Sequence, residues 1–212
     1  MNRGPLIFLG AFAVLAVSWT AAVLANQLGY GAVTPYYDSL EGTSFPSPMP
    51  GIAKQGESVY RDLGCVACHT QQVRRADVAS DIERGWGERP SMGRDYIQNG
   101  SVQLGSNHVG PDLRNVGARI TDETALYQML YAPSEDSSMP AYRFLFEERK
   151  ITGQPSAGAL NVPVAAGYEV VPTARARSLV AYLIQLNDTY SYPEVNFVPP
   201  TEEEAPAEEG GH

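Results

Sequence analysis

The segment that most constrains the fold of this chain is Gly64-Cys65-Val66-Ala67-Cys68-His69-Thr70. Cys65 and Cys68 are the only two cysteines among the 212 residues, and His69 follows directly. The C-x-x-C-H spacing is the attachment signature of c-type haem. Two thiols three positions apart on a helical turn reach the two vinyl groups of one porphyrin, and the next imidazole then points at the iron. The segment therefore predicts one covalently bound haem c with His69 as the proximal ligand.

Other uses of a cysteine pair fit the sequence less well. A structural zinc site needs four ligands, and the two remaining histidines, His108 and His212, lie far along the chain. A redox-active cysteine pair normally belongs to a βαβ unit, of which the sequence shows no sign. A disulfide between such close cysteines would enclose a very small loop and stabilise the fold little.

The composition limits the possible partners. A formal net charge of −9 argues against nucleic-acid binding. Sixteen prolines and twenty glycines predict long loops, as expected where a cofactor supplies part of the core. Residues 191–212 combine prolines with a glutamate cluster and show no hydrophobic periodicity, so they are predicted to form an acidic disordered tail.

The N-terminal region predicts a membrane anchor. Residues 5–28 contain no charged side chain, and a helix of about 20 apolar residues crosses a bilayer. Arg3 is the only charge before them, so residues 1–4 are expected in the cytoplasm and the rest on the periplasmic side of the inner (cytoplasmic) membrane. The alternative is a cleaved signal peptide, although the apolar regions of signal peptides usually run about 7–15 residues.

The rest of the chain divides into a linker and one domain. Residues 29–50 are rich in proline, glycine and serine and predict a semi-rigid linker. Residues 51–190 are predicted to form a mono-haem domain. Apolar residues recur at helical spacing in 51–63 and again in 175–187, so two amphipathic helices are expected near its ends.

With these helices the chain resembles a class I cytochrome c, whose first and last helices cross at a glycine–aromatic contact. The resemblance implies an all-α domain with long loops in which Gly56 meets Tyr182. It also implies that the Gly110-Pro111 turn offers the Pro111 carbonyl to the second nitrogen of His69, which fixes the tautomer of that ligand. An ordinary turn is the alternative.

The sixth iron ligand is expected to be Met139. It lies in a Met-Pro loop after the Gly-Pro turn and before the last helix, where class I cytochromes place the distal methionine. Met92 and His108 are the alternatives. A His–Met pair fills both axial positions, so the domain should transfer electrons and should not catalyse a reaction by itself.

Several motifs resemble a narrower family, the mono-haem subunit II of cbb3-type cytochrome c oxidases. They are Cys68-His69-Thr70-Gln71-Gln72-Val73-Arg74, Leu104-Gly105-Ser106, Gly110-Pro111-Asp112-Leu113 and Ser138-Met139-Pro140-Ala141-Tyr142. The resemblance covers roughly residues 56–146. It implies a membrane-anchored cytochrome that passes single electrons to the haem–copper catalytic subunit beside other cytochrome subunits. It also implies that Cys65 and Cys68 bind the haem and that His69 and Met139 ligate iron.

Two further questions stay open at this level. Arg74 could bind a haem propionate, since a guanidinium group suits a carboxylate, or it could belong to a solvated basic pair with Arg75 or contact another subunit. A free-standing electron shuttle, membrane-anchored or periplasmic, is the alternative function. An enzyme with a five-coordinate haem, such as a peroxidase or gas sensor, is a third.

Overall fold

The computed structural model describes residues 3–31, 33–191 and 193. The predicted acidic tail therefore lies outside the described residues from 194 onward. The helices and strands, in chain order, are α1 (Gly4–Trp19), α2 (Ala25–Tyr30), β1 (Tyr36–Asp38), β2 (Thr43–Phe45), α3 (Gly51–Asp62), α4 (Val116–Arg119), α5 (Glu123–Tyr131), β3 (Phe146–Lys150), β4 (Tyr168–Pro172) and α6 (Ala174–Gln185). Single turns also occur: η1 (Thr20–Leu24), which is a π turn, and the 3-10 turns η2 (Cys65–Ala67), η3 (Gly93–Tyr96) and η4 (Arg143–Leu145).

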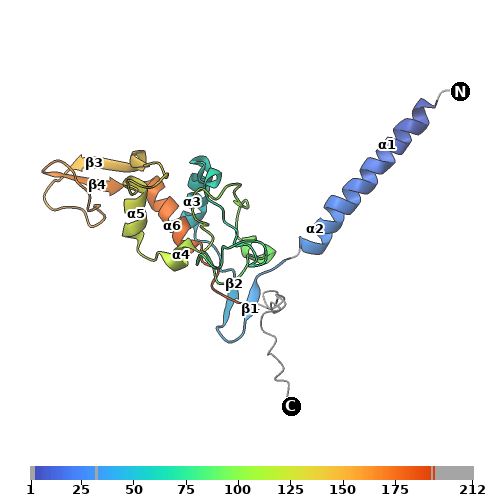
Figure 1. The fold of residues 1–212 in the computed structure, drawn as a ribbon, viewed down its shortest axis with the longest axis horizontal. Helices are drawn as coiled ribbons and strands as arrows, with labels where there is room; N and C mark the ends of the chain where they lie inside the picture. Colours follow the sequence, from blue (N-terminus) through green and yellow to red (C-terminus); the bar gives the residue numbers. More distant parts are fainter. Residues whose placement is uncertain (1–2, 32, 192, 194–212) are drawn as a thin grey trace, which may run out of the picture.

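The N-terminal helix stands apart from the rest of the chain. The segments α1, η1 and α2 form one continuous apolar helix, Gly4–Gly29, of 26 residues, with no buried residue in its most apolar part. It projects away from the other elements (Figure 1). At 1.5 Å per residue it is about 39 Å long, which exceeds the roughly 30 Å of a bilayer core. This helix fits the single-pass anchor predicted for residues 5–28.

The domain is built on the crossing of α3 and α6, which lie side by side in Figure 1. Gly56 makes this close approach possible. A Cβ atom there would lie 1.8 Å from the carbonyl oxygen of Ser178 and 2.7 Å from Cβ of Tyr182. The predicted contact between Gly56 and Tyr182 is therefore present.

Shorter helices complete the core around α6. Gly117 in α4 lets that helix approach the end of α6, since a Cβ there would lie 2.0 Å from the carbonyl oxygen of Ile184. Helix α5 contributes Leu126 and Leu130 to the same hydrophobic core. Asp122 begins α5, and its carboxylate accepts a hydrogen bond from the Thr124 N–H at 2.8 Å.

The prediction of an all-α fold is not confirmed, because two antiparallel hairpins are present. Strand β1 pairs with β2, and β3 pairs with β4 so that Phe146 lies opposite Pro172 and Lys150 opposite Tyr168. The β3–β4 hairpin lies at the far end of the molecule from α1 (Figure 1). Four of the five β3 residues are charged and exposed, so this short strand lacks the alternation that reveals strands in a sequence.

The segment predicted as a linker, 29–50, contains the β1–β2 hairpin and is fastened to the domain. The ring of Phe45 stacks on Tyr190, with centroids 4.7 Å apart and an interplanar angle of 12°. The Arg94 guanidinium donates to the Thr34 carbonyl. Met49 packs against the hydrophobic core. These contacts distinguish the segment from a loose spacer.

Candidate haem site

The two cysteines lie on the turn that follows α3. Gly64 has a φ of +71°, a left-handed conformation that ends the helix and starts η2. Both cysteines are free thiols, Cys65 half-buried and Cys68 exposed. Burial raises the pKa of the Cys65 thiol to about 11, and a hydrogen bond with Tyr142 offsets part of that rise.

The orientation of His69 is fixed from one side. Its Nδ1 lies 2.8 Å from the Pro111 carbonyl oxygen. A carbonyl oxygen only accepts hydrogen bonds, so Nδ1 carries the proton and the Nε2 lone pair is left available for a metal. The hydrogen bond predicted between Pro111 and His69 is thus present.

Two glycines allow the loop before Pro111 to close on His69. A Cβ atom on Gly110 would lie 2.3 Å from Cε1 and 2.6 Å from Nδ1 of the imidazole. Gly105 has a φ of +75°, and a Cβ there would lie 2.3 Å from the His69 carbonyl oxygen. The backbone of this loop therefore packs directly against His69. Larger residues at positions 105 and 110 would push His69 away from the loop.

A buried carboxylate holds the residues that follow His69. Asp112 is fully buried, and its carboxylate accepts hydrogen bonds from Thr70 Oγ1 at 2.6 Å and from the Gln72 N–H at 2.7 Å. It also accepts from the Arg114 N–H at 2.8 Å. Sequence reasoning noted the polar run from Thr70 but missed this partner, because the two segments are 40 residues or more apart.

Arg74 has a carboxylate partner within the chain. Its Nε and Nη2 donate to Asp81 at 2.9 and 2.8 Å, and its backbone N–H donates to the same side chain at 2.9 Å. The Arg74 guanidinium lowers the pKa of Asp81. A haem propionate would have to compete with this carboxylate, and the propionate role of Arg74 stays a prediction.

The loop that carries Met139 reaches the cysteine turn. Met139 is half-buried and packs against the same hydrophobic core as Cys65 and Tyr142. Tyr142, three residues later in its loop, interacts with the Cys65 thiol. The loop of Met139 and the cysteine turn therefore meet at one part of the core.

The two alternative ligands have other surroundings. His108 belongs to the loop on the Nδ1 side of His69, where its Nδ1 lies 3.3 Å from Thr70 Oγ1 and its ring stacks on Trp86 with centroids 5.9 Å apart. Met92 starts the η3 turn, and its N–H donates to Asp95 at 2.7 Å. His108 is therefore held by Thr70 and Trp86, in the same loop as the Pro111 carbonyl that bonds to Nδ1 of His69.

A comparison with known proteins decides the family. The family described as "Cytochrome C oxidase, mono-heme subunit/FixO" matches residues 17–187, which include the cysteine turn, the Gly-Pro turn and the Met139 loop. The chain belongs to this family. The resemblance to mono-haem subunit II of cbb3 oxidases is confirmed, and with it a haem-bearing, electron-transport subunit that forms a complex with the oxidase catalytic subunit. A search of curated proteins finds no match to the subunit.

The residues of the site suit the single haem of this family. Two thiols flank one turn, and the imidazole of His69 that follows has its Nε2 available for iron. The packing of Gly110 against the ring and the hydrogen bond from Nδ1 to the Pro111 carbonyl give the ring the fixed orientation that a proximal ligand needs. The second axial ligand predicted from the sequence, Met139, lies in the loop whose Tyr142 contacts Cys65, and its role stays a prediction.

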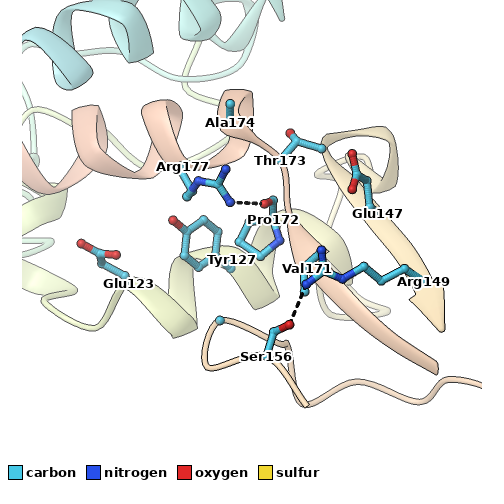
Figure 2. Close-up of a pocket in the computed structure, with 11 residues that line it drawn as sticks. Glu123, Tyr127, Glu147, Arg149, Ser156, Val171, Pro172, Thr173, Ala174 and Arg177 are labelled. Carbon is cyan, nitrogen blue, oxygen red and sulfur yellow. Dashed lines mark hydrogen bonds between the residues drawn. The ribbon is translucent and has the colours of Figure 1, made fainter. Parts of the chain in front are cut away.

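A separate cleft does not belong to this site. It measures about 420 Å³ and lies between the β3–β4 hairpin, α5 and the start of α6 (Figure 2). Arg177 in this cleft donates to the Pro172 carbonyl, and Arg149 donates to Ser156. The predicted haem-binding residues are not among those that line it.

Proposed function

We propose that the subunit binds one haem c through thioethers at Cys65 and Cys68 and passes single electrons to the haem–copper catalytic subunit of the oxidase. The observation that carries the proposal is the pair of free thiols followed by an imidazole whose Nδ1 is held at 2.8 Å by Pro111. This donor set supports covalent attachment and one axial bond. The family match supports the place in an oxidase.

The chain's own residues set the properties of the iron site. The bound haem supplies the one-electron iron couple. The Pro111 carbonyl keeps the proton on Nδ1 of His69 and raises the basicity of Nε2 toward iron. Met139 would supply a sulfur ligand to the iron, and a His–Met pair raises the reduction potential. With both His69 and Met139 binding iron, the site would transfer electrons and would leave no open position for a substrate.

The N-terminal helix supports a single-pass topology. We infer that residues 1–4 face the cytoplasm and that the haem domain lies on the periplasmic side of the inner membrane, since Arg3 is the one charge preceding the apolar stretch. In this position the haem domain can take electrons from neighbouring cytochrome subunits and hand them to the catalytic subunit.

Co-purification tests this function against a free-standing shuttle. Membranes are extracted with a mild detergent, and the tagged subunit is purified, denatured and stained for haem on a gel. We expect the subunit band to carry stain and the haem–copper subunit to elute with it. The variant with Cys65→Ser and Cys68→Ser should lose the stained band. A stained subunit that elutes without oxidase subunits would support the shuttle instead.

Carbon monoxide binding tests the enzyme alternative. A haem with two protein ligands resists carbon monoxide in the ferrous state, whereas a five-coordinate haem binds it readily. We expect the native subunit to show little spectral change on exposure to the gas. Rapid, complete binding would contradict the proposed His–Met ligation.

A further inference from the structure

A buried polar cluster lies where α3 crosses α6. It consists of Tyr60 on α3, Tyr182 on α6, and Gln71 and Asn99 on loops. The Tyr182 hydroxyl donates to Gln71 Oε1 at 2.8 Å, and the rings of Tyr60 and Tyr182 have centroids 5.6 Å apart. Tyr60, Gln71 and Tyr182 are at most 1% exposed. Polar groups buried this deeply need hydrogen-bond partners.

Three polar atoms of this cluster make no hydrogen bond of regular geometry among the described residues: Tyr60 OH, Gln71 Nε2 and Asn99 Nδ2. They belong to one place. The Tyr60 side chain lies beside Gln71, and the Tyr182 side chain lies beside Asn99. Because Gln71 also bonds to Tyr182, all four side chains converge.

One water molecule can serve all three atoms. The amide nitrogens of Gln71 and Asn99 only donate, and the Tyr60 hydroxyl can donate or accept. A water offers two acceptor sites to the two amides and can donate one of its protons to the tyrosine oxygen.

We propose that one water molecule is bound among Tyr60, Gln71 and Asn99 and that, through it, Gln71 positions the segment that carries His69. Gln71 follows His69 by two residues. Its carbonyl accepts from the Tyr96 hydroxyl at 2.8 Å and its N–H donates to the Leu104 carbonyl at 3.2 Å. The water would link this segment to α3 as Tyr182 links it to α6. The water site rests on the fold alone, so it is independent of the proposed electron acceptor.

A structure of the haem-loaded subunit in its oxidase complex, at a resolution that shows ordered water, tests the site directly. We expect one water within about 2.7–3.2 Å of at least two of the three atoms. In Tyr60→Phe the water should remain, held by the two amides. A dry site, in which the three atoms bond directly to protein groups, would overturn the proposal.

The positioning role has its own readout. In Gln71→Leu we expect loss of the water, a shifted reduction potential and a weakened long-wavelength band of methionine-ligated ferric haem. Gln72→Leu is the matched control, because the Gln72 side chain is exposed and only its backbone N–H bonds to Asp112. A Gln71→Leu variant with the potential and band of the control would refute the positioning role. Should that variant fail to fold, Tyr60→Phe still decides between a wet and a dry site.

Discussion

Gly110 and His69 are in direct backbone-to-ring contact, and the position of a missing Cβ, 2.3 Å from Cε1 of the imidazole, measures how close that contact is. We expect Gly110→Ala to push the ring off the Pro111 carbonyl. The variant should lose about 1–3 kcal/mol of stability, as overpacked sites do, and its haem should show weakened proximal ligation. Thermal unfolding and the visible spectrum measure the two effects.

Gly93→Ala is the control for this change, because no atom lies within 4 Å of the position a Cβ would take there. It should unfold like the native subunit and keep the native spectrum. Equal behaviour of the two variants would show that the Gly110 contact does not matter for the ring.

Replacing Met139 tests the second axial ligand. In Met139→Ala the ferric protein should lose the long-wavelength band that methionine ligation produces, and its reduction potential should fall. His108→Ala should keep the band, since the His108 ring is held by Thr70 and Trp86. A native ferric spectrum without the band, or a Met139→Ala variant that keeps it, would contradict the assignment. Absorption spectra of the oxidised subunit are sufficient to decide.

The α3–α6 crossing should be intolerant of a methyl group at Gly56. A Cβ there would lie 1.8 Å from a main-chain oxygen of Ser178, which cannot move without shifting α6. We expect Gly56→Ala to destabilise the domain by about 3 kcal/mol or more, at or beyond the upper end of overpacking costs. Gly51→Ala, at an open position on the same helix, should cost far less. Comparison of their melting temperatures checks this.

The Arg74–Asp81 pair should make stability depend on acid pH. The Arg74 hydrogen bond lowers the pKa of the Asp81 carboxyl below its usual 3.8. The pair therefore stabilises the folded state above that pH, and its contribution is lost as the pH falls through the folded-state pKa. Asp81→Asn should cost about 1–2 kcal/mol at neutral pH, with the partial exposure of Arg74 limiting the loss.

Unfolding of both proteins by denaturant across the acid range tests this prediction. The difference in stability between native protein and Asp81→Asn should be constant near neutral pH and should shrink in acid. A difference that stays the same at every pH would mean that the charge of Asp81 contributes nothing.

The parts of the fold that the sequence predicted are those with a short-range signal. Helical spacing predicted the helices observed as α3 and α6, and the C-x-x-C-H spacing predicted the cysteine turn. In both cases neighbouring residues carry enough information to identify the structure. The contact of Gly56 with Tyr182 joins distant residues, and it was predicted from the resemblance to class I cytochromes c.

The parts that were missed depend on partners distant in sequence or on irregular backbone. The β3 strand escaped because its exposed charges hide its periodicity. Asp112 could not be linked to Thr70 without knowing that two loops meet. The pairing of Arg74 with Asp81 spans only seven residues, but no regular element fixes the geometry between them. Buried polar residues such as Gln71 look like surface residues in a sequence.

The attachment of Arg94 to Thr34 has a consequence for how the subunit works. Helix α2 ends at Tyr30, so three residues, 31–33, separate it from this attachment point at Thr34. Fully extended, the four residue-to-residue steps from Tyr30 to Thr34 span about 14 Å. With the N-terminal helix in the membrane as proposed, the haem domain would stay within that distance of the bilayer surface and could not diffuse away from it.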